Sequence, residues 1–358
     1  MTERKKIIRY HEVKLVIVSM LTALMCCVLA FALKWSTEMA QYGLYHFAHQ
    51  HLVWFLIFPT CGITAIYFLR KYLFQNRKNK GITEIYKTLD QRKDHLPFFK
   101  IPSHFLNGFL TVIFGGSTGI EVSTVVATAT IGNETYKRDF SANMYKRELV
   151  SAGVVAGVAV LFGSPIAGLF FALEVIARKV NKSLLLSCGA AALISWIFIL
   201  SIDTKPLLPF QINDWSWKAL PFFVLLSLFG ALISVYFTVL VIRIKAFFAR
   251  IPNNFVRVNL GALLVGAAIL CFPFLYGDSY HGMIELIGKV IDEEPVSLAV
   301  LALLLVMKPL VAALTLGAGG DGGEVELLAD VGNGQRSVRL DLVGDQRVLG
   351  RVNHDVGC

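Results

Sequence analysis

Long apolar runs separated by short polar segments dominate this chain. A transmembrane helix needs roughly 20 mostly apolar residues, and residues 15–33 and 52–69 meet this requirement without an internal charge. Six further apolar segments follow at short intervals: 105–131, 149–173, 184–202, 219–242, 260–276 and 296–316. The pattern therefore predicts an all-α membrane protein with many spanning segments.

Small residues and proline break two of these segments internally. The interruptions are Gly115, Gly116 and Gly119 in segment 105–131, and Gly163, Ser164 and Pro165 in segment 149–173. Pro165 suits the first turn of a new helix, and Gly153 and Gly157 permit close packing between helices. Helices that end inside a membrane are tolerated only where their backbone is buried in protein or lines a cavity. The chain is therefore predicted to contain discontinuous helices, unlike a simple up-and-down bundle.

Composition and charge narrow the class of protein further. Hydrophobic residues make up 55% of the chain and charged residues 16%, whereas soluble proteins carry about 25% charged residues. This excludes a disordered protein and argues against a soluble enzyme. The net charge of +9 lies in short clusters between apolar runs, so we expect a lipid bilayer as partner and no nucleic acid. Two early basic clusters, at 4–14 and 70–80, predict a cytoplasmic N-terminus.

The spacing of reactive residues predicts neither catalysis nor a metal site. The six cysteines have no CxxC spacing, and no HExxH motif occurs. We interpret the closely spaced His46, His49 and His51 as residues of an external loop or a membrane interface. An intramembrane enzyme is the alternative from another class, but no GxSG motif supports it. We therefore expect no catalytic residue, no metal and no cofactor.

Glu121 is the only acidic residue of the 105–131 segment. A carboxylate inside a membrane is costly and is by default a hypothesis of function. Glu121 directly follows the glycine-rich break and precedes an apolar run, which predicts a position at a helix N-terminus, where free N–H groups and the helix dipole favour negative charge. The same N–H groups can bind an anion when the carboxylate is elsewhere, so Glu121 can compete with a permeating ion. The alternative is an ordinary helix-capping acid.

Four stretches together resemble motifs of the CLC chloride channels and chloride/proton antiporters. Residues 119–123 (GIEVS) resemble the motif G-(K/R)-E-G-P, and residues 162–168 (FGSPIAG) resemble F-N-A-P-L-A-G. Residues 81–85 (GITEI) resemble the end of G-S-G-I-P-E-I, and residues 308–323 resemble the stretch that leads into G-x-F-x-P. Their order and spacing match the family over roughly residues 14–323.

The resemblance implies a fold and a function. Residues 1–323 would form a CLC-type transmembrane domain, an inverted repeat of broken and tilted helices. Such a protein would be a homodimer with one pathway per subunit for chloride or a similar monovalent anion. We expect a multi-pass protein of the bacterial inner membrane with its N-terminus in the cytoplasm.

The resemblance also assigns site residues. Glu121 aligns with the external gating glutamate of the family. Backbone N–H groups would serve two anion sites, the external one through Gly119, Ile120 and Val122 and the central one through Gly81 and Ile82. Lys80 aligns with the serine of the central site and would attract chloride by charge, although it is not the usual hydroxyl ligand.

One departure from the family concerns proton coupling. Antiporter members carry an internal proton-transfer glutamate one position after the residue that matches Glu174, and this chain has Val175 there. Valine cannot carry a proton, so the sequence favours a chloride channel with a glutamate gate and no proton coupling. The alternatives are a chloride/proton antiporter and a non-functional truncated product of a CLC gene. Glu174 itself is equally well interpreted as an ion-pair partner of the nearby Arg178.

The composition changes abruptly after residue 323. Residues 324–358 contain no Phe, Trp, Tyr, Ile, Lys or Pro, and the family pattern does not continue in them. We expect a non-homologous tail, read out of frame or produced by an interrupted gene, so that the second half of the repeat is truncated. The alternative is a short soluble extension.

Overall fold

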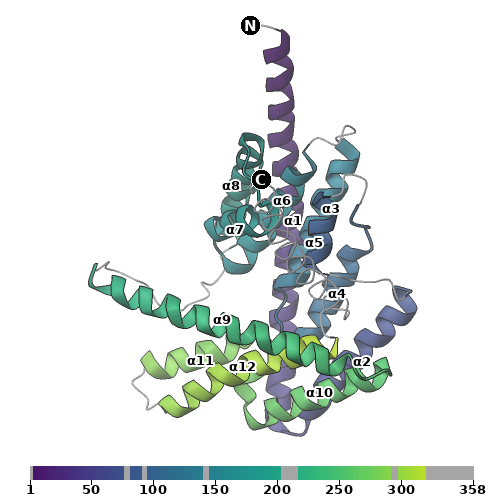
Figure 1. Ribbon diagram of the computed structural model, residues 1–358, viewed down its shortest axis with the longest axis vertical. Helices are drawn as coiled ribbons and strands as arrows, with labels where there is room; N and C mark the ends of the chain where they lie inside the picture. The colour runs from purple at the N-terminus through teal and green to yellow at the C-terminus, as the bar shows by residue number, and fades with distance from the viewer. Residues whose placement is uncertain are drawn as a thin grey trace, which may run out of the picture.

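The computed structural model describes residues 3–75, 81–90, 95–139, 145–202, 217–291 and 297–319. Within these ranges every regular element is a helix, which agrees with the predicted all-α class. The α-helices are α1 (Glu3–Gln50), α2 (Trp54–Phe68), α3 (Ile82–Asp90), α4 (Lys100–Ile113), α5 (Glu121–Asp139), α6 (Lys146–Phe162), α7 (Pro165–Phe171), α8 (Lys182–Ser201), α9 (Leu220–Phe248), α10 (Asn254–Cys271), α11 (Tyr280–Ile291) and α12 (Leu298–Ala318) (Figure 1). Lys80 and the predicted tail 324–358 lie outside the described residues.

Helix α1 is much longer than the predicted span 15–33. Its 48 residues extend about 70 Å at 1.5 Å per residue, more than twice the hydrocarbon thickness of a bilayer. Residues 34–50 contain no proline to end the helix, and buried residues continue at helical spacing through Thr37 and Gln41. The loop alternative is therefore wrong for His46 and His49, which lie on α1, and their place at a membrane interface stays a prediction.

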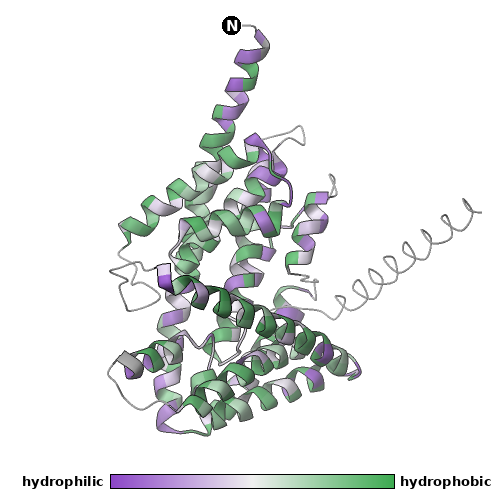
Figure 2. Cartoon of the chain, turned by 60° about the vertical axis from the view of Figure 1, so that its left-hand side comes forward, coloured by the Kyte–Doolittle hydropathy of each residue, from purple (hydrophilic) through white to green (hydrophobic). Residues whose placement is uncertain are grey.

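Among the described residues, five helices are long and apolar enough to cross a membrane, judged by length and composition. They are α1, α8, α9 with the turn before it, α10 and α12. Figure 2 shows hydrophobic residues along most of the molecule and hydrophilic ones at the free N-terminal end of α1. The number and apolar character of these helices are those of an integral multi-pass membrane protein.

Both predicted helix breaks are confirmed. Segment 105–131 divides into α4, which ends at Ile113, and α5, which begins at Glu121. Segment 149–173 divides after Phe162, where Gly163 adopts φ +65° and ends α6. Ser164 then caps α7 by accepting a hydrogen bond from Ala167 N at 3.3 Å, and Pro165 occupies the first turn. These residue types suit the two ends of a break, because glycine tolerates positive φ and proline lacks a backbone donor.

Helix α6 forms the core of the first group of helices. It is apolar on all sides, nearly all of its residues from Lys146 to Leu161 are buried, and it packs against α1, α5 and α8. A Cβ atom on Gly153 would lie 2.5 Å from the backbone oxygen of Thr128, and one on Gly157 would lie 2.8 Å from the Thr128 side chain. The predicted close packing at these two glycines is therefore confirmed.

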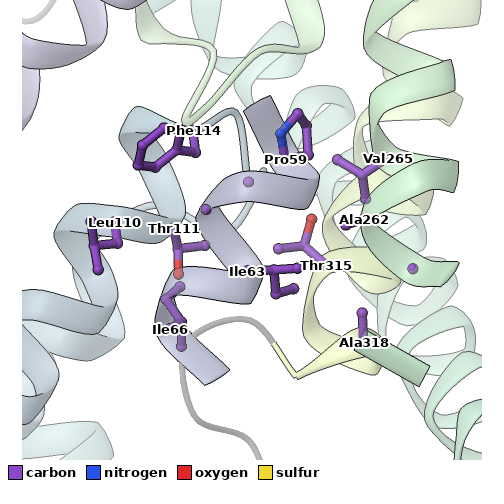
Figure 3. A pocket seen from close by; sticks show the side chains of 13 residues that line it. Pro59, Ile63, Ile66, Leu110, Thr111, Phe114, Ala262, Val265, Thr315 and Ala318 are labelled. Atoms are coloured by element: carbon purple, nitrogen blue, oxygen red, sulfur yellow. The ribbon is translucent and has the colours of Figure 1, made fainter. Parts of the chain in front are cut away.

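A second group contains α2 and α9–α12 and lies against the break in the first group (Figure 1). Figure 3 shows the junction, a cavity of about 20 Å³ between α2, α4, α10 and α12, lined by residues such as Pro59, Leu110, Ala262 and Thr315. This volume suffices for about one water molecule. Gly116, part of the glycine-rich break, also lines it, so the break is covered by protein from the second group.

Replacing Gly153 by alanine is expected to lower stability, because the new methyl group must displace the backbone of α5 at Thr128. Overpacking of this kind costs about 1–3 kcal/mol. The matched control is Gly189→Ala on α8, where nothing lies within 4 Å of the added Cβ and alanine favours the helix by about 1 kcal/mol. The thermal unfolding midpoint of the detergent-solubilised protein measures both. Equal midpoints would contradict the close contact of α5 and α6.

Candidate functional site

Glu121 lies at the position predicted for it, the first residue of α5. The preceding Gly119 adopts φ +69°, and the Glu121 carboxylate folds back over it, so that a Cβ atom on Gly119 would overlap the carboxylate oxygens. The carboxylate therefore stays at the positive end of its own helix, where the first N–H groups have no partner within the helix. Only glycine provides both the backbone angle and the space for this arrangement.

The N-terminus of α3 lies beside the N-terminus of α5. Gly81, directly before α3, would bring a Cβ atom to 3.9 Å from Cγ1 of Val122. Ile82, the first residue of α3, and Val122 pack against the same hydrophobic core, and Ile120 is buried. The structure thus brings together the predicted residues of both anion sites, and their role as anion ligands stays a prediction. Lys80, the other predicted residue, falls outside the described part of the chain.

Glu121 and Ile120 lie on the wall of a cavity of about 580 Å³. The other walls come from α1, from the end of α6 and from the segment around the start of α11. The charged and amide side chains on these walls are Lys34, Glu38, Gln41 and Asp278. Lys34 also donates to the backbone oxygen of Leu161 at 3.1 Å, which fixes it to the C-terminal end of α6. The candidate site is therefore a mostly apolar cavity with a few charged side chains, and it ends at the N-terminus of α5.

Residues 276–280, here called the 276–280 turn, fasten the second group of helices onto the glycine-rich break. The Tyr276 hydroxyl donates to the backbone oxygen of Ile113 at 2.5 Å, and Gly277 N donates to the backbone oxygen of Gly115 at 3.3 Å. Gly115 has φ +90°, and a Cβ atom there would lie 2.9 Å from the Tyr276 ring. The break thus accepts hydrogen bonds that its own helices cannot supply.

The end of this turn contacts Glu121 directly. The Tyr280 hydroxyl lies 3.3 Å from Oε1 of Glu121 and donates to it. Asp278 Oδ1 accepts from Gln41 Nε2 and from Tyr280 N, both at 3.1 Å. Lys308, on α12, donates to the backbone oxygen of Gly277 at 3.0 Å and to Ser279 Oγ at 2.7 Å. The sequence-based interpretation did not foresee Tyr280 or Asp278, because it ended the apolar span at residue 276 and began the next one at residue 296.

Comparison with known proteins gives the family. The model of the family described as "Voltage gated chloride channel" matches residues 61–326, well over half of the chain. The chain belongs to this family, the CLC family.

Two curated relatives illustrate the similarity. "Probable chloride channel protein UM03490-D" of Mycosarcoma maydis is 32% identical over 162 residues, which cover 43% of this chain and 14% of that protein. "H(+)/Cl(-) exchange transporter ClcA" of Cronobacter sakazakii is 26% identical over 252 residues, 66% of this chain and 53% of that protein. The chain therefore spans about half or less of the length of these relatives.

The fold is of the CLC type. The solved structure titled "Crystal structure of a CLC-type fluoride/proton antiporter" superposes with a TM-score of 0.66 over 88% of this chain and 84% of that one, at 21% sequence identity. At this identity the likeness concerns the fold alone. The prediction of a CLC-type membrane protein with broken helices is thereby confirmed.

The position that matters for proton coupling in CLC antiporters lies on an irregular helical turn. Glu174 and Val175 belong to the π-helical turn Ala172–Ala177, and Val175 packs against the core around α6. Arg178 stacks its guanidinium 3.9 Å above the ring of Tyr86, and among the described residues no ion pair joins it to Glu174. The side chain of Val175 is not part of the cavity wall that carries Glu121.

A buried polar face on α4 also escaped the sequence-based interpretation. Its residues are Lys100, Ser103, His104, Asn107 and Thr111. Lys100 pairs with Glu84 of α3, whereas both ring nitrogens of His104 and Oδ1 of Asn107 have no hydrogen-bond partner within the part of the chain that the structure describes. Gly108, on the same helix, contacts Ser123 at the start of α5. The helical spacing of these polar residues could have revealed the face, had segment 105–131 not been considered separately from residues 100–104.

Replacing Gly119 by alanine is expected to destabilise the protein by about 1–2 kcal/mol from the left-handed backbone alone and further through the overlap with Glu121. The overlap disappears when Glu121 is also replaced by alanine. The loss caused by Gly119→Ala should therefore be smaller in the Glu121→Ala background than in the wild-type background. Thermal unfolding of the wild-type protein, the two single variants and the double variant measures this difference. Strictly additive losses would show that the carboxylate does not lie over Gly119.

Proposed function

We propose that this chain conducts chloride or a similar monovalent anion across a membrane as a CLC channel, with Glu121 as its gate. The observation that carries the proposal is the carboxylate of Glu121, which lies at the N-terminus of α5 and on the wall of a large cavity. In the closed state the carboxylate occupies the place of the anion. When it leaves, the N–H groups of Ile120 and Val122 bind the anion, and those of Gly81 and Ile82 form the next site inward.

The strength of these interactions suits a gate. A negative charge at a helix N-terminus is stabilised by about 0.3–2 kcal/mol. A carboxylate and a free anion therefore compete on similar terms, and neither is held so tightly that it cannot leave. Helix termini also attract anions without a full positive charge that would trap them.

The proposed orientation follows from the basic residues and from the place of the cavity. Lys14, in the basic N-terminal cluster, precedes Lys34 of the cavity wall by 20 residues, about 30 Å along a helix and close to the hydrocarbon thickness. If the basic end is cytoplasmic, the cavity faces the outside. Labelling of a Tyr42→Cys variant from outside intact cells tests this orientation.

We further propose a homodimer in the bacterial inner membrane, as the family resemblance implies. The exposed apolar residues of α7 and α8, among them Ile166, Phe170 and Leu193, offer a surface for a second subunit or for lipid. Chemical crosslinking in native membranes separates a dimer from a monomer.

Anion flux into liposomes that contain the full chain tests the proposed gate. The Glu121→Gln variant keeps the shape of the side chain but loses the charge that competes with chloride. Since about 1 kcal/mol of charge–dipole interaction is lost, we expect chloride flux to rise ~5-fold. Glu134→Gln, on the same helix but paired with Lys137 at 3.1 Å, is the matched control and should leave the flux unchanged.

Two results would overturn this proposal. The first is the absence of chloride flux through both the wild-type protein and the Glu121→Gln variant when each is folded and inserted. The second is a flux that Glu121→Gln and Glu134→Gln change to the same extent, since Glu121 would then have no special role.

Chloride/proton exchange is the second candidate function, and two observations favour it. One is the buried polar face of α4, where His104, whose ring nitrogens have no hydrogen-bond partner among the described residues, offers a titratable side chain, whereas Val175 does not. The other is that ClcA and the fluoride/proton antiporter, both similar to this chain, are exchangers by name. A chloride gradient should then drive proton uptake in the wild-type protein, and His104→Asn should abolish the proton movement. Chloride flux without proton movement supports the channel.

A further inference from the structure

We propose that the 276–280 turn is a latch for the gate, in which the Tyr280 hydroxyl holds the Glu121 carboxylate in its closed position and Lys308 holds the turn. This inference rests on the proposed function, because it concerns the regulation of the same carboxylate. It adds two residues, Tyr280 and Lys308, that neither the sequence motifs nor the family comparison assigns to gating. The hydrogen bond from Tyr280 to Glu121, 3.3 Å long, is the observation on which it depends.

A latch must be held in place, and three sets of hydrogen bonds attach the 276–280 turn to the rest of the protein. The hydrogen bonds of Tyr276 and Gly277 attach it to the glycine-rich break. Gln41 of α1 attaches it through Asp278, whose Oδ1 also accepts from Tyr280 N. Lys308 of α12 attaches it through Gly277 and Ser279. The hydroxyl of Tyr280 is thus positioned by three separate helices or helix ends.

Lys308 makes this support stronger than its two hydrogen bonds suggest. It lies inside the apolar helix α12, directly before Pro309, where an ammonium group is costly unless it is paired. Its hydrogen-bond acceptors among the described residues, the oxygens of Gly277 and Ser279, both belong to the turn. Moving the turn would leave a partly buried cation without these two acceptors, so a charged Lys308 keeps the turn against α12.

The latch should act only on the ionised gate. A carboxylate accepts a hydrogen bond from a hydroxyl much more strongly than a neutral carboxylic acid does. Protonation of Glu121 therefore weakens its hydrogen bond with Tyr280. Besides Tyr280, the titratable or charged groups among the described residues that face Glu121 or line the same cavity are Asp278, Lys308, Lys34, Glu38, Tyr42, Tyr45 and Tyr276. The effect of removing the Tyr280 hydroxyl should therefore be large at neutral pH and small at acidic pH.

Chloride flux through Tyr280→Phe in liposomes is the first test. Loss of a hydrogen bond to a charged group should raise the flux about 10- to 100-fold at neutral pH, and the increase should disappear as the pH falls. Tyr42→Phe is the matched control, because Tyr42 lines the same cavity and no hydrogen bond joins it to Glu121 among the described residues. If Tyr280→Phe lowers the flux or leaves it unchanged, the proposal is overturned, because the hydroxyl would then either bind the anion or have no role in gating.

The role of Lys308 requires variants that separate position from charge. Ser279→Ala removes one hydrogen-bond acceptor of Lys308 and keeps the charge of Lys308. Lys308→Met removes the charge and both hydrogen bonds to the turn. Each should raise the flux in the wild-type background. Neither should raise it further in the Tyr280→Phe background, because both act through the Tyr280 hydroxyl. Full additivity would show that Lys308 affects the flux by another mechanism, such as direct attraction of the anion.

A stability measurement tests the latch even if no anion moves. Tyr280→Phe should lower the thermal unfolding midpoint in the wild-type background but not in the Glu121→Ala background, where no carboxylate remains to accept the bond. If this coupling is observed but no chloride moves, the proposed function is overturned and the contact between Tyr280 and Glu121 stands. If chloride moves but the coupling is absent, the latch is overturned and the proposed function stands.

Discussion

The unpaired N–H groups at the start of α5 are the constraint on which this structure depends. A helix that begins inside a membrane protein needs partners for these groups, such as a negative charge, a cover of neighbouring protein or the contents of a cavity. Glu121 supplies the charge from the first residue of the helix itself. Gly119 makes this possible, because its backbone angle and missing side chain leave room for the carboxylate.

The cover comes from a part of the chain that is distant in sequence. The 276–280 turn bonds to the break through Ile113 and Gly115. Residues of α2, α10 and α12 line the small cavity of Figure 3, and Gly116 lines it too. Behind the break, α6 is buried on all sides, and its glycines let α5 approach closely. The position of the candidate gate is therefore set by the contact between the two helix groups, and neither group alone could hold it.

The cavity in front of Glu121 has a mixed charge. Glu38 and Asp278 lie on its wall together with Lys34, so its net charge does not favour anions. On the proposed function, selection for anions must then come from the helix N-termini at Glu121 and Gly81, where N–H groups converge. The carboxylates of the wall are better suited to set the potential around the gate and to anchor the 276–280 turn through Asp278.

Local residue patterns were enough to predict which segments are apolar, where two of them break and that Glu121 begins a helix, because each property depends on neighbouring residues. Local signals also placed Pro165 at a helix start. They failed for the length of α1, because its polar second half is stabilised by packing at Thr37 and Gln41. The contact of Tyr280 with Glu121 depends on the three-dimensional fold, since these residues are 159 positions apart. The same holds for Lys308, which no local pattern distinguishes from a lysine that faces water, because its partners belong to a separate turn.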